Sequence, residues 1–414
     1  MTEPVPVPPR IPAGARDILA VEAEELREVA DRWRAHVALA GYREVATPML
    51  EYAEAVDRAQ AGASDDAYRL FDEAGRVMVL RPDLTIPVAR LVATRLADHP
   101  GPVRVSYVAS AFRPPRPGRP RATELRQAGI EMVGAAHPGA DAEVIAVLVG
   151  SLRAAGVRRP RIALGDVSLT RAVMDGLGVD TATRTALGRA LSERDLVGWR
   201  ERVGAAGLAQ EGAALLADLP TLSGDVTVLD RIRETVPSAR EACESLERTV
   251  ATAARHGVDR ELRVDLGVLR DWSYYSGVVF EAYAPGASEP LAVGGRYDGL
   301  AERFGAPRPA IGFAVALEQL HRAVLEVRGS YPALRAGVVL VGGLDTHAEP
   351  AADARAAGVT VIALGADDGD RADALAAAEG WRYVARPEYG GTLAVSDRAW
   401  GEKRICADLR EFTE

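Results

Sequence analysis

Apolar residues recur along the chain at helical spacing in several segments. From Val21 onward they fall every three or four positions, at Leu26, Val29, Ala30, Trp33 and Val37, and Gly41 follows as a C-cap. The same reasoning predicts a helix after the turn at 81–85 and another over 140–155. Residues 168–260 are rich in Ala, Leu and Arg with few strand signals, so we expect an inserted helical subdomain there.

Short apolar or alternating runs predict strands between these helices. They cover 42–45, 76–80, 103–109, 125–134, 160–166, 262–268 and 276–283. The segment GGRYDG (294–299) is predicted to be a hairpin turn, because glycine and aspartate suit positive φ. Residues 309–327 read as a strand that passes into a helix. Proline excludes helix and central strand from 112–121, which we expect to be an exposed basic loop joining two antiparallel strands.

Both ends of the chain differ from its centre. Residues 1–10 are rich in proline and predict a flexible arm. The pattern changes again after 329–332, where short buried-type strands alternate with Ala-rich helices. This alternation predicts a small α/β domain over about 333–414, behind a core at 11–330.

Composition narrows the class of protein. The chain has 414 residues, 48% of them hydrophobic, and a net charge of −9, which argues against disorder and mildly against a nucleic-acid binder. Two cysteines and six scattered histidines predict neither a disulfide framework nor a metal site. There is no apolar run of membrane-spanning length and no signal peptide at the N-terminus, so we expect a cytoplasmic protein.

One strand carries the clearest candidate chemistry. Alternation places Gln127, Gly129 and Glu131 on one face of the strand at 125–134. The glycine would leave room for a small ligand flat on the sheet, with Glu131 facing an ammonium or imidazole group and Gln127 supplying hydrogen bonds. The alternative is an ordinary sheet with one solvated polar face.

Three further segments hold candidate site residues, each with a structural alternative. Asp83 or Thr85 could cap the following helix or converge on an amine at the rim of the sheet. The arginines of the basic loop, beginning at Arg113, could grip phosphate or simply be solvated, because Lys403 is the only lysine and arginine is favoured throughout. Tyr274 and Tyr275 should point to opposite faces, so that at most one lines a pocket.

Taken in order, seven segments resemble the histidyl-tRNA synthetase fold family over most of residues 11–325. They are PAGARD (12–17), GYREVATPMLEY (41–52), LRPDLTIPVAR (80–90), FRPPRPGRPRATELRQAGIEMVG (112–134), LRDWSYYSGVVFEAY (269–283), GGRYDGL (294–300) and PAIGFAVALEQL (309–320). The resemblance implies an α+β fold, with a class II aminoacyl-tRNA synthetase-like antiparallel sheet flanked by helices. It also implies a homodimer formed through 41–52.

Within that superfamily the chain looks closer to the regulatory subunit of short-form ATP phosphoribosyltransferase than to the synthetases. The synthetases usually read RPEGT where this chain has RPDLT, and the arginine expected in their third motif is Gln319 here. Replacing guanidinium by amide removes a positive charge that would face a triphosphate. Thr123 and Ser273 also depart from the synthetase pattern, at a basic position and an aspartate respectively.

The resemblance therefore implies a non-catalytic regulatory subunit with no cofactor. Its partner would be the short-form catalytic ATP phosphoribosyltransferase chain in a hetero-oligomer, and its effector would be histidine, the product of the pathway. A divergent histidyl-tRNA synthetase and an amino-acid-activating paralogue are the alternatives. By position, the histidine pocket would comprise Asp83, Thr85, Arg113, Gln127, Glu131, Arg270, Tyr274 and Tyr275. The domain at 333–414 resembles a shortened anticodon-binding domain, but its acidic stretch at 367–379 would repel the phosphates of a tRNA.

Overall fold

The computed structural model describes residues 10–115, 122–268, 274–285, 287, 289–328 and 335–412. The expected arm at 1–10 and the tip of the basic loop therefore lie almost wholly outside the described residues, as does Arg270. The chain divides into two compact units, Met1–Val327 and Arg328–Glu414.

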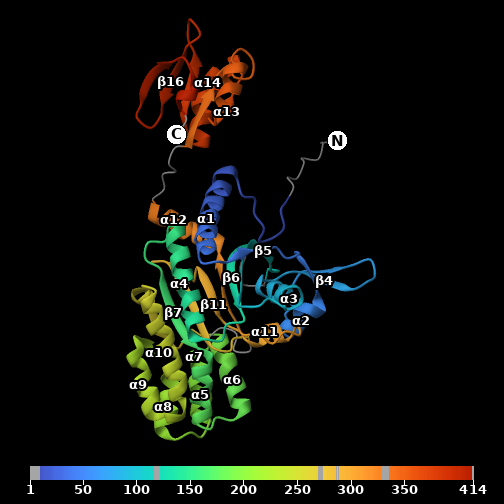
Figure 1. Cartoon of the computed structure of the whole chain (residues 1–414), viewed down its shortest axis with the longest axis vertical. Coiled ribbons are helices and arrows are strands. Elements are labelled where there is room, and N and C mark those ends of the chain that lie inside the picture. Colours follow the sequence, from blue (N-terminus) through green and yellow to red (C-terminus); the bar gives the residue numbers. More distant parts are fainter. Residues whose placement is uncertain are drawn as a thin grey trace, which may run out of the picture. The chain divides into compact units, whose positions relative to one another are not determined.

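A nine-stranded sheet forms the centre of the first unit (Figure 1). In spatial order its strands are β1 (Arg43–Glu44), β5 (Val103–Phe112), β6 (Glu124–Val133), β12 (Ala310–Ala316), β11 (Ala292–Arg296), β10 (Val278–Tyr283), β7 (Arg161–Asp166), β9 (Leu262–Asp265) and β8 (Ser223–Gly224). The pairs β1–β5 and β7–β9 are parallel and the other pairs are antiparallel. The expected antiparallel arrangement is thus confirmed for the central strands, within a sheet that is mixed overall.

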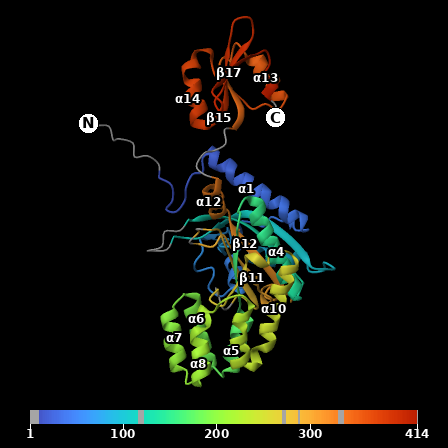
Figure 2. The same cartoon turned by 90° about the vertical axis from the view of Figure 1, so that its left-hand side faces the viewer.

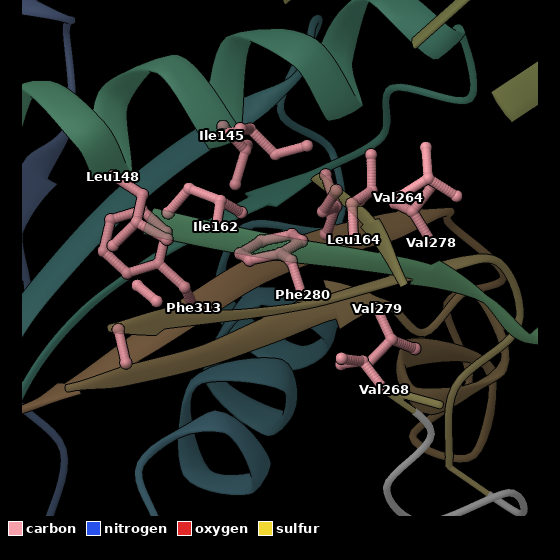
Figure 3. Packing of buried hydrophobic residues seen from close by; sticks show 14 of the residues in the cluster. Ile145, Leu148, Ile162, Leu164, Val264, Val268, Val278, Val279, Phe280 and Phe313 are labelled. Carbon is pink, nitrogen blue, oxygen red and sulfur yellow. The ribbon is translucent and has the colours of Figure 1, made fainter. Parts of the chain in front are cut away.

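Helices cover both faces of this sheet. On one face lie α1 (Ala20–Leu39) and α4 (Pro138–Ala155), whose apolar residues share a core with β6, β7 and β10. Figure 3 shows Ile145 and Leu148 of α4 above Ile162 and Phe280 of the sheet. The other face packs against α3 (Thr85–Arg95) and α2 (Ala53–Ala59). The alternating side chains of β6 therefore face two different hydrophobic cores on opposite sides of the sheet.

A small three-stranded sheet and a helical insertion flank this core. A three-stranded sheet is formed by β2 (Leu50–Tyr52), β4 (Val77–Leu80) and β3 (Arg69–Phe71). The helical insertion is present, with α6, α7 and α8 side by side (Figure 2). Its helices are α5 (Val167–Gly176), α6 (Thr181–Ser192), α7 (Leu196–Ala205), α8 (Gln210–Asp218), α9 (Asp230–Thr235) and α10 (Arg240–Arg255). After β12 the chain continues into α12 (Leu317–Arg328), as the sequence pattern indicates.

The prediction of a hairpin turn at GGRYDG is wrong. Gly294 and Gly295 lie inside β11, and only the residues after Arg296 turn into the short helix α11 (Gly299–Glu302). The glycines serve close packing, because a Cβ on Gly294 would lie 2.5 Å from the Phe280 ring and one on Gly295 would lie 2.8 Å from the Tyr275 ring.

The second unit is a small α/β fold, as its alternating pattern predicts. Its sheet runs β14 (Val361–Ala363), β13 (Arg335–Leu340), β15 (Trp381–Pro387), β16 (Leu393–Asp397) and β17 (Glu402–Cys406). Residues of α13 (Ala348–Ala356) and α14 (Gly369–Glu379) pack with alternate residues of β13, so the two helices cover opposite faces. The strand β17 is missed by the sequence pattern, since EKRIC has only two apolar residues.

Candidate functional site

The centre of the site is the carboxyl group of Glu131, which lies on β6 and is 1% exposed. The Tyr107 hydroxyl donates to its Oε1 at 3.2 Å, and the Tyr297 hydroxyl donates to its Oε2. Thr85 also makes a side-chain hydrogen bond to it. Burial raises the pKa of Glu131 to about 8 in spite of these hydrogen bonds, so the group is mostly protonated at neutral pH.

The start of α3 brings Asp83 and Thr85 to this carboxyl. Asp83 Oδ1 accepts a hydrogen bond of 2.8 Å from the Ile86 backbone N–H, so it closes the first turn of the helix. Burial raises the pKa of Asp83, while the nearby Arg113 charge opposes that shift. Asp83 therefore stabilises the start of the helix, as expected from the sequence, and it also lies beside Glu131.

Glycines on adjacent strands let side chains approach the sheet closely. A Cβ on Gly129 would lie 2.3 Å from the Tyr107 hydroxyl, and one on Gly312 would lie 1.7 Å from Glu131 Oε2. The space that the sequence assigned to a ligand above Gly129 is thus filled by the Tyr107 ring. That part of the prediction is wrong, because Tyr107 is the direct cross-strand partner of Gly129 and its side chain lies over the missing Cβ.

Three tyrosines extend this cluster. The Tyr274 ring packs edge-on to Tyr275, with centroids 5.0 Å apart, and stacks on Tyr297 at 5.4 Å. Burial raises the pKa of Tyr274 well above its usual value, and the Glu131 charge contributes in the same direction. Tyr274 and Tyr275 precede β10 and do not lie within a regular strand, so the strand alternation from which opposite faces were predicted does not apply to them.

Gln127 and Arg113 lie at the margin of the cluster. Gln127 shares the face of Glu131 on β6, and its buried Oε1 has no hydrogen-bond partner among the described residues. The Arg113 Nε donates to the Pro82 carbonyl at 2.9 Å. Of the eight candidate residues, the structure places Asp83 and Thr85 beside Glu131 and joins Tyr274 and Tyr275 in the adjoining aromatic cluster. It leaves Arg113 and Gln127 at the margin, and Arg270 lies outside the described residues.

Sequence reasoning missed Tyr107 and Tyr297, the two hydroxyl donors to Glu131. Tyr107 could have been found by pairing the strand at 103–109 with 125–134 and asking what faces Gly129. Tyr297 was hidden by interpreting GGRYDG as a turn. A buried ion pair holds that segment in place, because Arg296 Nε donates to Asp141 Oδ1 at 2.9 Å and both side chains are about nine-tenths buried.

Gln319 lies at the start of α12. Its Nε2 donates to Glu289 Oε2 at 2.7 Å, so the amide is held by a carboxylate. Another acid, Glu318, accepts from the Arg126 backbone N–H at 3.3 Å. Two carboxylates therefore lie around the position where the synthetase pattern places an arginine.

This arrangement suits the recognition of a small cationic ligand. A buried carboxyl, three hydroxyl groups and an unpaired amide oxygen offer acceptors for an ammonium or imidazole group. Within the described ranges, no group of three or more His, Cys, Asp or Glu side chains is arranged to hold a metal ion. A search of the same ranges for a helix that could span a membrane finds none.

Comparison with known proteins identifies the family to which this fold belongs. A family model described as histidyl-tRNA synthetase matches residues 14–320. The histidyl-tRNA synthetase from Nostoc sp. PCC 7120 superposes with a TM-score of 0.81 over 98% of this chain and 99% of that chain, at 21% identity. Fold and site thus define a class II synthetase-like protein of the histidyl-tRNA synthetase type.

Relatives with higher sequence identity to this chain define its family more closely. Proteins named ATP phosphoribosyltransferase regulatory subunit match from Symbiobacterium thermophilum (40% identity, 75% of this chain, 79% of that protein) and Moorella thermoacetica (38%, 90% and 96%). A structure from Bacillus halodurans C, described as an ATP phosphoribosyltransferase regulatory subunit/histidyl-tRNA synthetase, has a TM-score of 0.81 at 30% identity, covering 92% of this chain and 99% of that one. The chain belongs to the family of ATP phosphoribosyltransferase regulatory subunits, whose role is not catalytic.

Proposed function

We propose that this chain binds histidine at the Glu131 site and, as a homodimer formed through residues 41–52, regulates a short-form catalytic ATP phosphoribosyltransferase subunit. The observation that carries the proposal is the buried Glu131 carboxyl, with hydroxyl groups on both oxygens and the unpaired Gln127 Oε1 on the same face. The names of the relatives supply the catalytic partner.

Histidine suits this site by charge and by shape. Its cationic group would take the place of a tyrosine hydroxyl at Glu131, and the ion pair formed would favour loss of the carboxyl proton. The aromatic cluster of Tyr274, Tyr275 and Tyr297 offers an apolar surface against which an imidazole would pack. Feedback regulation would then follow if the partner prefers one ligation state of this subunit.

A divergent synthetase is the competing function, and the surroundings of Gln319 argue against it. Binding ATP needs positive charge opposite the phosphates. The described side-chain partner of Gln319 is instead the carboxylate of Glu289, and the neighbouring Glu318 is occupied in an ion pair with Arg126 at 3.5 Å. We therefore expect the purified chain to show no histidine-dependent ATP–pyrophosphate exchange, which also separates the proposal from an amino-acid-activating paralogue.

Calorimetry with histidine tests the site. Glu131→Ala removes the charge-assisted contact and should weaken binding by about 1.5–3 kcal/mol. Glu54→Ala, which removes an exposed carboxylate in the first turn of α2, is the matched control and should bind as the wild type does. Equal binding by Glu131→Ala and wild type would show that the pocket lies elsewhere.

Co-expression with a short-form catalytic subunit tests the partner. The two chains should co-purify, and histidine should inhibit the phosphoribosyltransferase activity of the complex. In a complex that contains Glu131→Ala, inhibition should need more histidine. If the complex forms but histidine does not change its activity, the proposal that histidine is the effector is wrong. The proposal of the catalytic partner would still stand.

A further inference from the structure

A small cavity lies at the end of the main sheet where the parallel strands β7 and β9 begin. Its volume is about 220 Å³, which is less than that of a typical small-molecule pocket and suits a small ion with bound water. The lining comes from the turns that precede the two strands, and comprises Arg159, Pro160, Arg161, Arg260 and Glu261. Three arginines from two segments far apart in the sequence therefore meet in one cavity.

The guanidinium of Arg161 is held in place by the backbone. Its Nη1 donates to the Arg260 carbonyl at 2.9 Å, whereas Nε and Nη2 make no hydrogen bond within the described residues. Pro160 fixes its own φ and favours an extended conformation of Arg159. Because alternate residues of an extended segment point to the same side, Arg159 and Arg161 can both reach a ligand in the cavity.

Nearby acids do not balance the positive charge of this wall. Glu261 is the one acid among the lining residues, and Arg153 pairs with its Oε1 at 2.5 Å. Arg159, Arg161 and Arg260 form no ion pair in the part of the chain that the structure describes. Three guanidinium groups and one carboxylate give the wall a net charge of +2, so an anion entering the cavity is attracted.

The ends of two helices account for only part of this positive charge. The helices α4 and α10 end at Ala155 and Arg255, just before the two strands, and each helix C-terminus attracts cations with a partial charge of about −0.5. Residues 153–161 and 255–263 together contain seven arginines and two acids, an excess larger than two helix ends neutralise. The concentration of arginine also contrasts with the net charge of −9 of the whole chain.

We propose that this cavity binds a phosphate dianion, free or as the end of a small monoester, between the guanidinium groups of Arg159, Arg161 and Arg260. Guanidinium groups bind pairs of phosphate oxygens, and a dianion matches the net charge of the wall. A carboxylate has one negative charge and would leave the wall positive. The proposed dimer contact does not cover the cavity, because five strands separate β1 from β7, roughly 30 Å at the usual strand spacing.

Calorimetry on the full chain at mildly alkaline pH tests the proposal with inorganic phosphate, methyl phosphate and dimethyl phosphate. The first two are dianions and should bind one site per chain, whereas dimethyl phosphate, a monoanion, should bind about tenfold or more weakly. Equal affinity for methyl phosphate and phosphate supports an ester as the ligand, and weaker binding of methyl phosphate supports the free ion. Equal binding of dimethyl phosphate, several sites without saturation, or no binding of phosphate would overturn the proposal.

Variants locate the bound phosphate. Arg159→Gln and Arg260→Gln should each weaken phosphate binding by about tenfold. Both side chains are exposed and make no hydrogen bond within the described residues, so we expect these variants to fold. Arg200→Gln, at an exposed position of α7, removes the same charge and should bind as the wild type does.

Glu261→Gln tests the sign of the effect. It removes the one negative charge of the wall, so phosphate should bind more tightly than to the wild type. A role of Glu261 and the arginines in folding alone would not increase the affinity for phosphate. Unchanged affinity in Arg159→Gln and Arg260→Gln would overturn the assignment of the site.

Discussion

At the scale of single residues, the protonation of Glu131 governs the candidate site. A carboxyl with a pKa of about 8 is neutral in the free protein at pH 7 and donates or accepts hydrogen bonds as an uncharged group. A cationic ligand needs the ionised form. Ligand binding and proton release are therefore linked at this one side chain.

This linkage predicts a pH dependence of histidine binding. As the pH rises from 6 towards 8, Glu131 loses its proton more readily, so the affinity of the wild type should rise relative to that of Glu131→Gln by up to about tenfold per pH unit. Comparison with Glu131→Gln cancels the titration of histidine itself. Calorimetry in buffers of different ionisation enthalpy measures the proton release directly, and a constant affinity ratio would contradict the raised pKa.

Glu131 also shows which features of the site could be predicted from the sequence. The sequence predicted that Gln127, Gly129 and Glu131 share one face of the strand, because side chains alternate between the two faces with a period of two residues. The donors to Glu131 could not be predicted from strand period alone, because Tyr107 lies on β5 and Tyr297 follows β11. They reach Glu131 only through the pairing of β5 and β12 with β6 and of β11 with β12. Which side chain fills the space over a glycine depends on the register of the neighbouring strand.

At the scale of elements, glycines inside strands determine how closely side chains approach the sheet. Gly294 and Gly295 of β11 and Gly312 of β12 accommodate Phe280, Tyr275 and Glu131 respectively. Sequence alone read the first two as turn residues, because glycine is favoured both where φ is positive and where packing is close. Only the neighbouring side chains distinguish these two uses.

Substitution of Gly312 tests the role of glycine in close packing against the sheet. Gly312→Ala would place a methyl group 1.7 Å from Glu131 Oε2 and 2.3 Å from the Ile130 carbonyl, so we expect it to destabilise the fold by about 1–3 kcal/mol or more. Gly204→Ala in α7 has no atom within 4 Å and should stabilise the protein by about 0.5–1 kcal/mol. Chemical denaturation measures both changes, and a neutral Gly312→Ala would show that β12 relaxes freely.

At the scale of the whole molecule, the two units have separate cores. Every buried residue in the two large clusters precedes Val327, and every residue in the two small clusters follows Arg335. Each unit therefore buries its own apolar surface, which is the property of an independent domain.

Removing the second unit should accordingly leave the first intact. A chain of residues 1–330 should unfold cooperatively and bind histidine within about twofold of the full-length affinity, because the described residues of the Glu131 site all belong to the first unit, which has its own core. Circular dichroism and calorimetry measure the two properties. If the truncated chain lost histidine affinity while remaining folded, the site would depend on the second unit.

The sequence by itself determined most of the elements, the fold family and the position of Glu131 on its strand, because periodicity and motif order can be recognised in the chain without coordinates. Tertiary structure alone decided which groups meet that carboxyl and that Tyr107 fills the space over Gly129. Burial and pairing register arise only when segments far apart in the sequence come together, and those quantities set the chemistry of the Glu131 site.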